Sequence, residues 1–161
     1  MDQHTNLLVV SAHAADFVWR GGGTIAKYVK AGANVSLVIL SYGARGESND
    51  LWKVEGQTLE NVKAVRRSEI EAAAECLGVK DYEIWDYEDY HMTITPERTL
   101  QLVRKIREAR PNVILTHGPR DAFNPDHETV SRFVFEASVL ATSAGVRDVD
   151  LPKIKQPKLF G

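Results

Sequence analysis

Residues 7–23 read Leu7-Leu8-Val9-Val10-Ser11-Ala12-His13-Ala14-Ala15-Asp16-Phe17-Val18-Trp19-Arg20-Gly21-Gly22-Gly23. The first part is an apolar, β-branched run typical of a buried strand, and the glycines lead into a helix. His13 and Asp16 stand three residues apart on the predicted connecting loop. In an open parallel sheet such a loop lies at the carboxyl end of a strand, where these folds bind ligands. The pair can converge on one divalent metal, or it can be a histidine that is only hydrogen-bonded to an aspartate.

A βαβ unit extends outward from this loop. We expect a strand over residues 6–11, a helix from Gly21 to about Ala31 and a second buried strand over 35–40. Two parallel strands joined by a helix require a crossover connection, which is right-handed in almost all proteins. Apolar spacing in the rest of the chain predicts helix 58–77, strand 82–86, helix 95–110, strand 113–117 and a helix that begins near His127. This alternation predicts an α/β fold, a Rossmann-like three-layer sandwich with a mostly parallel central sheet.

The composition is that of one α/β domain over residues 1–161. Of these residues, 43% are hydrophobic, and 20 basic side chains stand against 22 acidic ones, which gives a net charge of −2. No basic block indicates nucleic acid, and no apolar run approaches the ~20 residues that a membrane span requires. The segment 1–4 lacks the character of a signal peptide. The single cysteine, Cys76, is expected to be a small core residue in a reducing cytoplasm.

Residues 151–161 resemble a loop that enters a strand without completing it. We therefore expect the chain to be a truncated form that lacks the C-terminal part of a longer protein. An incomplete sheet exposes an edge strand, and such an edge can support a homo-oligomer.

Three more polar loops follow predicted strands and should face the same edge as His13. The loop 41–50 offers Arg45 and Glu47, each of which can be a site residue or part of a solvated turn. The acidic loop 86–91 fits a solvated turn better than a second metal site. The last loop, residues 118–127, ends in His127. Two imidazoles and a carboxylate from two loops, with room for water, match the open three-ligand site of catalytic Zn²⁺, and they also suit Fe, Mn or Co.

With these residues the chain resembles the PIG-L/LmbE-like family of zinc-dependent α/β proteins. The family carries an Ala-His-Pro-Asp-Asp-Glu-type motif after the first strand and a Pro-Asp-His-type motif late in the sheet. The similar stretches here are Ala12-His13-Ala14-Ala15-Asp16-Phe17, Gly22-Gly23-Thr24-Ile25-Ala26, Gly43-Ala44-Arg45-Gly46-Glu47, Arg66-Arg67-Ser68-Glu69 and Asn124-Pro125-Asp126-His127. The resemblance implies that His13, Asp16 and His127 are the metal ligands.

Two departures from the family pattern bear on the reaction. The resemblance implies a catalytic aspartate at the position of Ala15 and a histidine at the position of Asn124. General acid–base groups contribute roughly 10²–10⁴-fold each, so their loss should leave poor amide hydrolysis.

Residues 11–20 and 45–48 instead look like the 4-oxalomesaconate hydratase branch of the family, which acts in gallate breakdown and adds water to a carbon–carbon double bond. This likeness implies a metal-dependent hydro-lyase, with Zn²⁺ or another divalent metal and Glu47 as the general acid or base. A small anionic substrate requires fixed cations, and guanidinium groups bind carboxylates bidentately. The candidate substrate-binding residues are Arg20, Arg45, Arg66, Arg120 and Asn124. The alternatives are a zinc-dependent N-deacetylase and a non-catalytic protein that binds a metal or a ligand.

Overall fold

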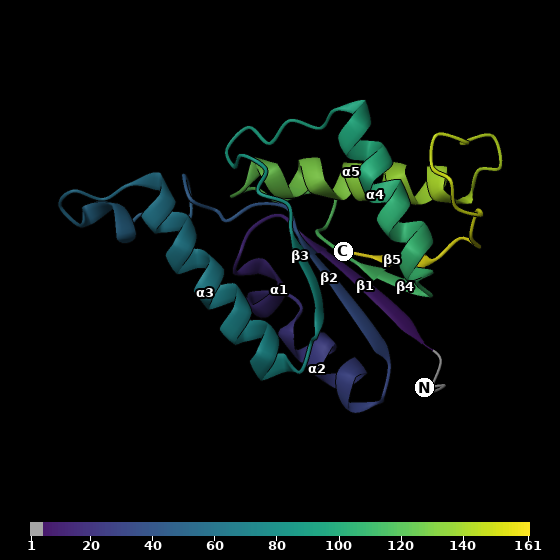
Figure 1. Ribbon diagram of the computed structural model, residues 1–161, viewed down its shortest axis with the longest axis horizontal. Helices are drawn as coiled ribbons and strands as arrows, with labels where there is room; N and C mark the ends of the chain where they lie inside the picture. The colour runs from purple at the N-terminus through teal and green to yellow at the C-terminus, as the bar shows by residue number, and fades with distance from the viewer. Residues whose placement is uncertain (1–4) are drawn as a thin grey trace.

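A five-stranded sheet forms the centre of the structure, a computed structural model that describes residues 5–161 (Figure 1). The strands are β1 (Asn6–Ser11), β2 (Asn34–Ile39), β3 (Asp81–Ile84), β4 (Val113–Leu115) and β5 (Lys158–Phe160). The helices are α1 (Asp16–Trp19), α2 (Gly22–Lys30), α3 (Leu59–Leu77), α4 (Pro96–Ala109) and α5 (Pro125–Thr142), with a 3-10 turn η1 (Leu51–Lys53). The strand order is β3-β2-β1-β4-β5, and each of these neighbouring pairs is parallel. The predicted α/β fold with a parallel sheet is confirmed.

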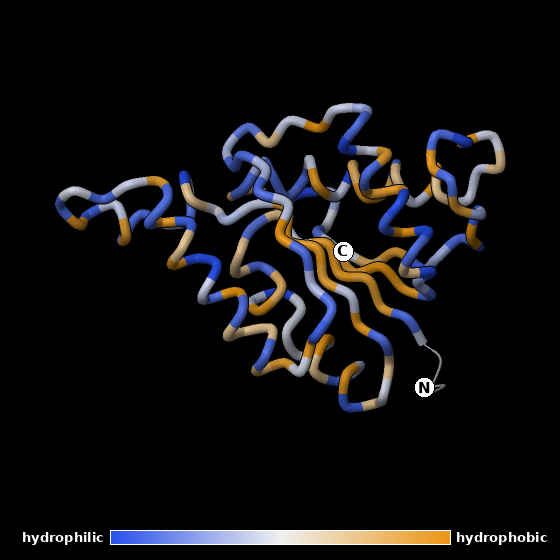
Figure 2. The backbone as a smooth tube through the Cα atoms, viewed as in Figure 1, coloured by the Kyte–Doolittle hydropathy of each residue, from blue (hydrophilic) through white to orange (hydrophobic). Residues whose placement is uncertain are grey.

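Helices cover both faces of the sheet because successive residues of β1 point to opposite sides. Leu8 and Val10 pack in one core cluster with residues of α4 and α5. Leu7 and Val9 pack in a second cluster with residues of α1, α2 and α3. Figure 2 shows the hydrophobic residues concentrated along the central strands between these two layers. A strand that is buried on both faces explains why the apolar run at residues 7–10 does not alternate with polar residues.

Helix boundaries follow local signals that the sequence already displays. The Thr58 side chain accepts a hydrogen bond from the backbone N–H of Asn61 at 3.2 Å and caps α3. Gly78 ends that helix with a left-handed φ of 74°, which glycine adopts without steric cost. Thr95 caps α4 in the same way as Thr58, with proline at the first helical position. The predicted positions of both helices are therefore confirmed.

The topology brings the loops after β1 and β4 together at one edge of the sheet. β1 leads into α1 and α2 on one face, whereas its neighbour β4 leads into α5 on the other face. Adjacent strands whose connections leave in opposite directions form a topological switch point, where open α/β sheets bind ligands. The predicted location of the site thus coincides with this switch point.

Several expectations need correction. Asp16 does not lie on a loop but begins the four-residue helix α1, which forms before the glycines. The fourth strand ends at Leu115, so His117 lies beyond it. Cys76 is exposed on α3 and is not a core residue. Asp89, expected in a solvated acidic turn, is buried with 3% exposure, because it accepts backbone hydrogen bonds. Residues 158–160, in the segment expected to enter a strand without completing it, form the short strand β5 and pair with β4.

Among residues 5–161, no helix is long and apolar enough to cross a bilayer.

Candidate metal centre

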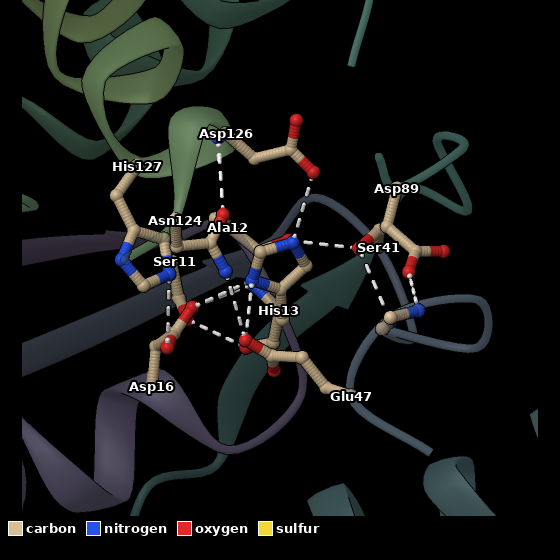
Figure 3. A network of polar contacts seen from close by, with 12 residues as sticks. Ser11, Ala12, His13, Asp16, Ser41, Glu47, Asp89, Asn124, Asp126 and His127 are labelled. Carbon is tan, nitrogen blue, oxygen red and sulfur yellow. Dashed lines mark hydrogen bonds and ion pairs between the residues drawn. The ribbon is translucent and has the colours of Figure 1, made fainter. Parts of the chain in front are cut away.

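Four side chains of the types that can bind a metal, from four segments, meet at the switch point (Figure 3). His13 follows β1, Asp16 begins α1, Glu47 lies on the loop after β2, and His127 lies in the first turn of α5. One potential ligand atom of each residue lies within 4.8 Å of the corresponding atoms of the other three. The structure thus brings together the three predicted ligands and the predicted catalytic residue Glu47.

The contacts within this cluster leave two imidazole nitrogens available for a cation. His13 Nδ1 lies 3.2 Å from Glu47 Oε1 and 3.3 Å from Asp16 Oδ2. His127 Nε2 lies 3.3 Å from Asp16 Oδ1. Both nitrogens are buried, and neither has a hydrogen-bond partner among residues 5–161. Buried polar atoms normally find a partner, so two unpartnered nitrogens that face carboxylates fit a metal ion.

A second carboxylate contacts the far nitrogen of each histidine. His13 Nε2 lies 3.2 Å from Asp126 Oδ2, and His127 Nδ1 lies 2.8 Å from Asp121 Oδ2. Histidine ligands commonly donate their second N–H to a carboxylate, which fixes the tautomer and the orientation of the ring. Both histidines are therefore oriented with their unpartnered nitrogens toward Asp16.

The charges around His13 favour a cation at the centre. Burial lowers the pKa of His13, but contacts with Asp126, Asp16 and Glu47 outweigh this effect and raise the pKa to about 11. Burial raises the pKa of Asp16, yet the nearby imidazoles of His127 and His13 bring that pKa well below its usual range. Three carboxylates around one imidazole thus stabilise positive charge, and a divalent metal would supply it in place of a proton.

Gly43 allows the close approach of the two loops that carry His13 and Glu47. Its φ of 63° lies in the left-handed region. A Cβ at this position would lie 3.2 Å from the Cβ of His13 and 3.3 Å from the Cβ of Glu47. Both the conformation and the space at Gly43 therefore require glycine.

The backbone N–H of His13 donates a hydrogen bond to Asp16 Oδ2 at 2.8 Å. This hydrogen bond fixes the spacing of the first two predicted ligands.

Asn124, predicted as a substrate-binding residue, contacts Glu47. Its Oδ1 caps α5 by accepting the backbone N–H of Asp126 at 3.0 Å, and its Nδ2 donates to Glu47 Oε1 at 3.1 Å. Asn124 is buried, with 6% exposure. It therefore orients the carboxylate of Glu47 across the interface between two loops that are far apart in the sequence.

The four candidate arginines lie in different surroundings. Arg20 Nη2 lies 3.0 Å from Asp121 Oδ2, which links this side chain to His127. Arg45 is exposed and lies 3.9 Å from Glu88, whereas Arg66 pairs with its helix neighbour Glu69. Arg120 is exposed on the loop before α5. Of the four, Arg20 contacts a residue that itself contacts the cluster.

Sequence reasoning missed three residues that surround the ligands: Asp121, Asp126 and His117. His117 is buried, its ring stacks on His127 with centroids 4.0 Å apart, and its Nε2 accepts the backbone N–H of Ala12 at 3.0 Å. Burial lowers the pKa of His117 to about 4, which keeps this imidazole neutral. His117 is the last residue of the predicted strand 113–117, and this position at the predicted edge is the signal that could have identified it.

A cavity of about 210 Å³ borders Asp16, Arg20 and His117 beside the cluster. A larger cavity of about 620 Å³ lies between α4 and α5, and none of the four clustered residues lines it. Of these two cavities, the smaller one adjoins the candidate metal ligands.

The fold and this cluster define a class of protein, and comparison with known families identifies it. The family model of PIG-L, described as GlcNAc-PI de-N-acetylase, matches residues 8–138. The chain belongs to the PIG-L family.

Relatives within the family include a hydratase and several deacetylases. The chain is 41% identical over 140 residues to the 4-oxalmesaconate hydratase of Pseudomonas putida KT2440. The match covers 87% of this chain and 54% of the relative. It is 32% identical to 1D-myo-inositol 2-acetamido-2-deoxy-alpha-D-glucopyranoside deacetylase 2 of Catenulispora acidiphila. The match covers 89% of this chain and 54% of that relative. The crystal structure of GalB, the 4-carboxy-2-hydroxymuconate hydratase of Pseudomonas putida KT2440, superposes with a TM-score of 0.91 at 37% identity, over 96% of this chain and 64% of that one. The chain thus spans about half the length of the curated relatives that it matches.

Proposed function

We propose that this chain carries the metal site of a hydro-lyase that adds water to an unsaturated keto polycarboxylate such as 4-oxalomesaconate. The observation that carries the proposal is the carboxylate of Glu47, 3.2 Å from His13 Nδ1, in a site where Ala15 stands between His13 and Asp16. The Glu47 carboxylate approaches the cluster from a neighbouring loop. Ala15, between the proposed ligands His13 and Asp16 in the sequence, has only a methyl group. The similarity to a 4-oxalmesaconate hydratase in sequence and to the GalB hydratase in structure, both from Pseudomonas putida KT2440, supports the same reaction.

Hydration of a carbon–carbon double bond forms one C–O bond and one C–H bond. A base takes a proton from the attacking water, and an acid delivers a proton to the other carbon. Glu47 is the proposed base, because its carboxylate lies at the cluster and Asn124 orients it through the amide N–H. Arg20 is the proposed partner of a substrate carboxylate, since its present partner, Asp121, lies beside His127.

His13, Asp16 and His127 would bind the metal, with Glu47 facing it. A divalent ion there would polarise substrate oxygens or lower the pKa of bound water. Zinc is the proposed ion, since two imidazoles and a carboxylate are a common ligand set for catalytic zinc, although iron, manganese and cobalt accept similar ligands.

The test is the metal-dependent loss of the ultraviolet absorbance of 4-oxalomesaconate. We expect activity from the zinc-loaded protein, its loss with a chelator, and a fall of about 10²-fold or more for Glu47→Gln. Absence of turnover by the metal-loaded, full-length protein would overturn the proposal.

The deacetylase relatives, which share the family with this chain, favour amide hydrolysis as the second candidate. Release of acetate from an N-acetylglucosamine conjugate at an ordinary enzymatic rate would favour that reaction, and retention of ligand affinity without any turnover would indicate a binding protein. The cytoplasmic location, the single domain over residues 1–161 and the self-association expected from the sequence remain predictions.

A further inference from the structure

The segment 86–92 crosses next to the loop that carries Glu47 and has an unusual backbone. Asp86, Tyr90 and His91 have positive φ values of 55°, 54° and 70°. Left-handed conformations cost L-residues of the order of 1 kcal/mol each, and they persist where the surrounding contacts require them. The contacts around this segment therefore hold it against the loop of Glu47.

Asp89 contacts the backbone immediately before Glu47 (Figure 3). Its Oδ2 accepts the N–H of Arg45 at 2.9 Å and the N–H of Gly46 at 2.8 Å, and its Oδ1 lies 3.1 Å from the Arg45 nitrogen. The side chain is buried, with the residue 3% exposed. Charge-assisted hydrogen bonds of this kind are stronger than neutral ones, so Asp89 fixes the peptide planes that lead into Glu47.

Tyr90 packs against the same loop that Asp89 contacts, at Gly46. A Cβ on Gly46 would lie 1.6 Å from Tyr90 Cε2, so the aromatic ring packs directly against the glycine. The backbone N–H of Tyr90 donates to Asp126 Oδ2 at 2.7 Å, and this oxygen also contacts His13. One short segment thus contacts both the loop of Glu47 and the carboxylate that orients His13.

We propose that Asp89 is a positioning residue that places the Glu47 carboxylate against the metal centre through the backbone of residues 45 and 46. This inference rests on the proposed role of Glu47. The rest of the loop has its own anchors, because Ser48 Oγ donates to the Gly43 carbonyl at 2.8 Å and Trp52 Nε1 donates to the Ala44 carbonyl at 2.7 Å. Loss of the Asp89 contacts should therefore displace Glu47 while the loop stays folded.

A double-mutant cycle tests whether Asp89 acts through Glu47. Asp89→Asn keeps the size of the side chain but removes its charge and one acceptor oxygen. We expect kcat to fall by about 10- to 100-fold with KM changed less than about threefold, the cost of misplacing a catalytic group by about 1 Å. In the Glu47→Gln background the same change should lower kcat by less than about threefold. An equal loss in both backgrounds, or no loss in either, overturns the proposal.

The control variant is Asp86→Asn, which alters the same segment at a side chain that pairs with Lys63 on the surface. Its kcat should match that of the wild-type protein. If Asp89→Asn does not fold, Asp89→Ser replaces it, since the smaller hydroxyl still offers one acceptor.

A cobalt readout separates this inference from the proposed reaction. Each protein is loaded with Co²⁺ and its visible absorption spectrum is recorded without substrate. We expect Asp89→Asn to change the spectrum in the same direction as Glu47→Gln does, while Asp86→Asn gives the wild-type spectrum. If the wild-type protein hydrates nothing, the hydratase proposal fails and this comparison still decides the role of Asp89. A wild-type spectrum for Asp89→Asn overturns that role.

Discussion

Asp126 Oδ2 lies 3.2 Å from His13 Nε2, although 113 residues separate the two in the chain. The same carboxylate accepts the backbone N–H groups of Tyr90 at 2.7 Å and Met92 at 3.0 Å. Burial raises the pKa of Asp126, but the His13 imidazole and these two backbone hydrogen bonds outweigh it and lower the pKa to about 2. The residue before His127 thus orients His13, the other proposed histidine ligand, so the two ends of the site are coupled.

Asp126→Asn should weaken metal binding. The amide cannot stabilise the imidazole as a carboxylate does, and loss of such an outer partner typically costs about 10- to 100-fold in metal affinity. Competition between the protein and a chromophoric zinc chelator measures the change. Asp50→Asn is the control, because Asp50 is exposed and pairs with Lys53 on the surface. Equal zinc affinity in Asp126→Asn and the wild-type protein would show that the contact does not support the ligand.

Zinc should stabilise the folded protein against heat. A ligand that binds the native state at 100 times its Kd adds about 2.7 kcal/mol, so the melting temperature should rise on zinc addition and fall again with a chelator. His13→Ala removes a ligand and should abolish the rise, whereas Mg²⁺, which prefers oxygen ligands, should have little effect on the wild-type protein. A similar rise in His13→Ala and in the wild-type protein would place the zinc elsewhere.

The chain order of strands and ligands could be predicted because the signals are local. The apolar run at residues 7–10 indicates a buried strand, and the histidine and the carboxylate three residues apart after it become candidate metal ligands once His127 is placed at the same edge. Since the carboxyl ends of parallel strands share one edge of the sheet, His127 and Glu47 could be assigned to that edge before the structure was known.

The partners of these residues could not be predicted, because they depend on contacts between distant segments. Asp89 stands in an acidic loop that is compatible with a solvated turn, yet its carboxylate accepts N–H groups from a loop 44 residues earlier. Nothing near Asp89 in the sequence distinguishes the two cases. Asn124 likewise has the helix-cap signal of an asparagine before Pro125, but its second contact, with Glu47, joins residues 77 positions apart.

Two variants of Asn124 should separate its two roles. Asn124→Ser keeps a capping oxygen but is too short to donate to Glu47, and Asn124→Ala removes both contacts. Loss of an N-cap costs about 1 kcal/mol, so the alanine variant should be less stable than the serine variant by about that amount in urea unfolding. Both variants should lose activity by a similar factor, because both leave Glu47 without its amide donor. Full activity in Asn124→Ser would show that the amide contact does not serve Glu47.

Arg107→Met should destabilise the fold far from the metal centre. The guanidinium is buried, with the residue 3% exposed, and it donates to the carbonyl oxygens of Leu140, Ala141, Ser143, Val146, Val149 and Leu151. Methionine fills similar space without any donor, so all six carbonyls lose the guanidinium as a donor and the free energy of unfolding should fall by at least about 3 kcal/mol.

Urea unfolding measures that loss, and amide hydrogen exchange locates it. Exchange should accelerate first in residues 143–151, whose carbonyls Arg107 binds, while β1 stays protected until global unfolding. Arg104→Met is the matched control, because Arg104 lies one turn earlier on the exposed face of α4 and should change stability by less than about 0.5 kcal/mol. Equal effects of the two substitutions would contradict the prediction, since Arg107 donates to this segment and Arg104 is exposed.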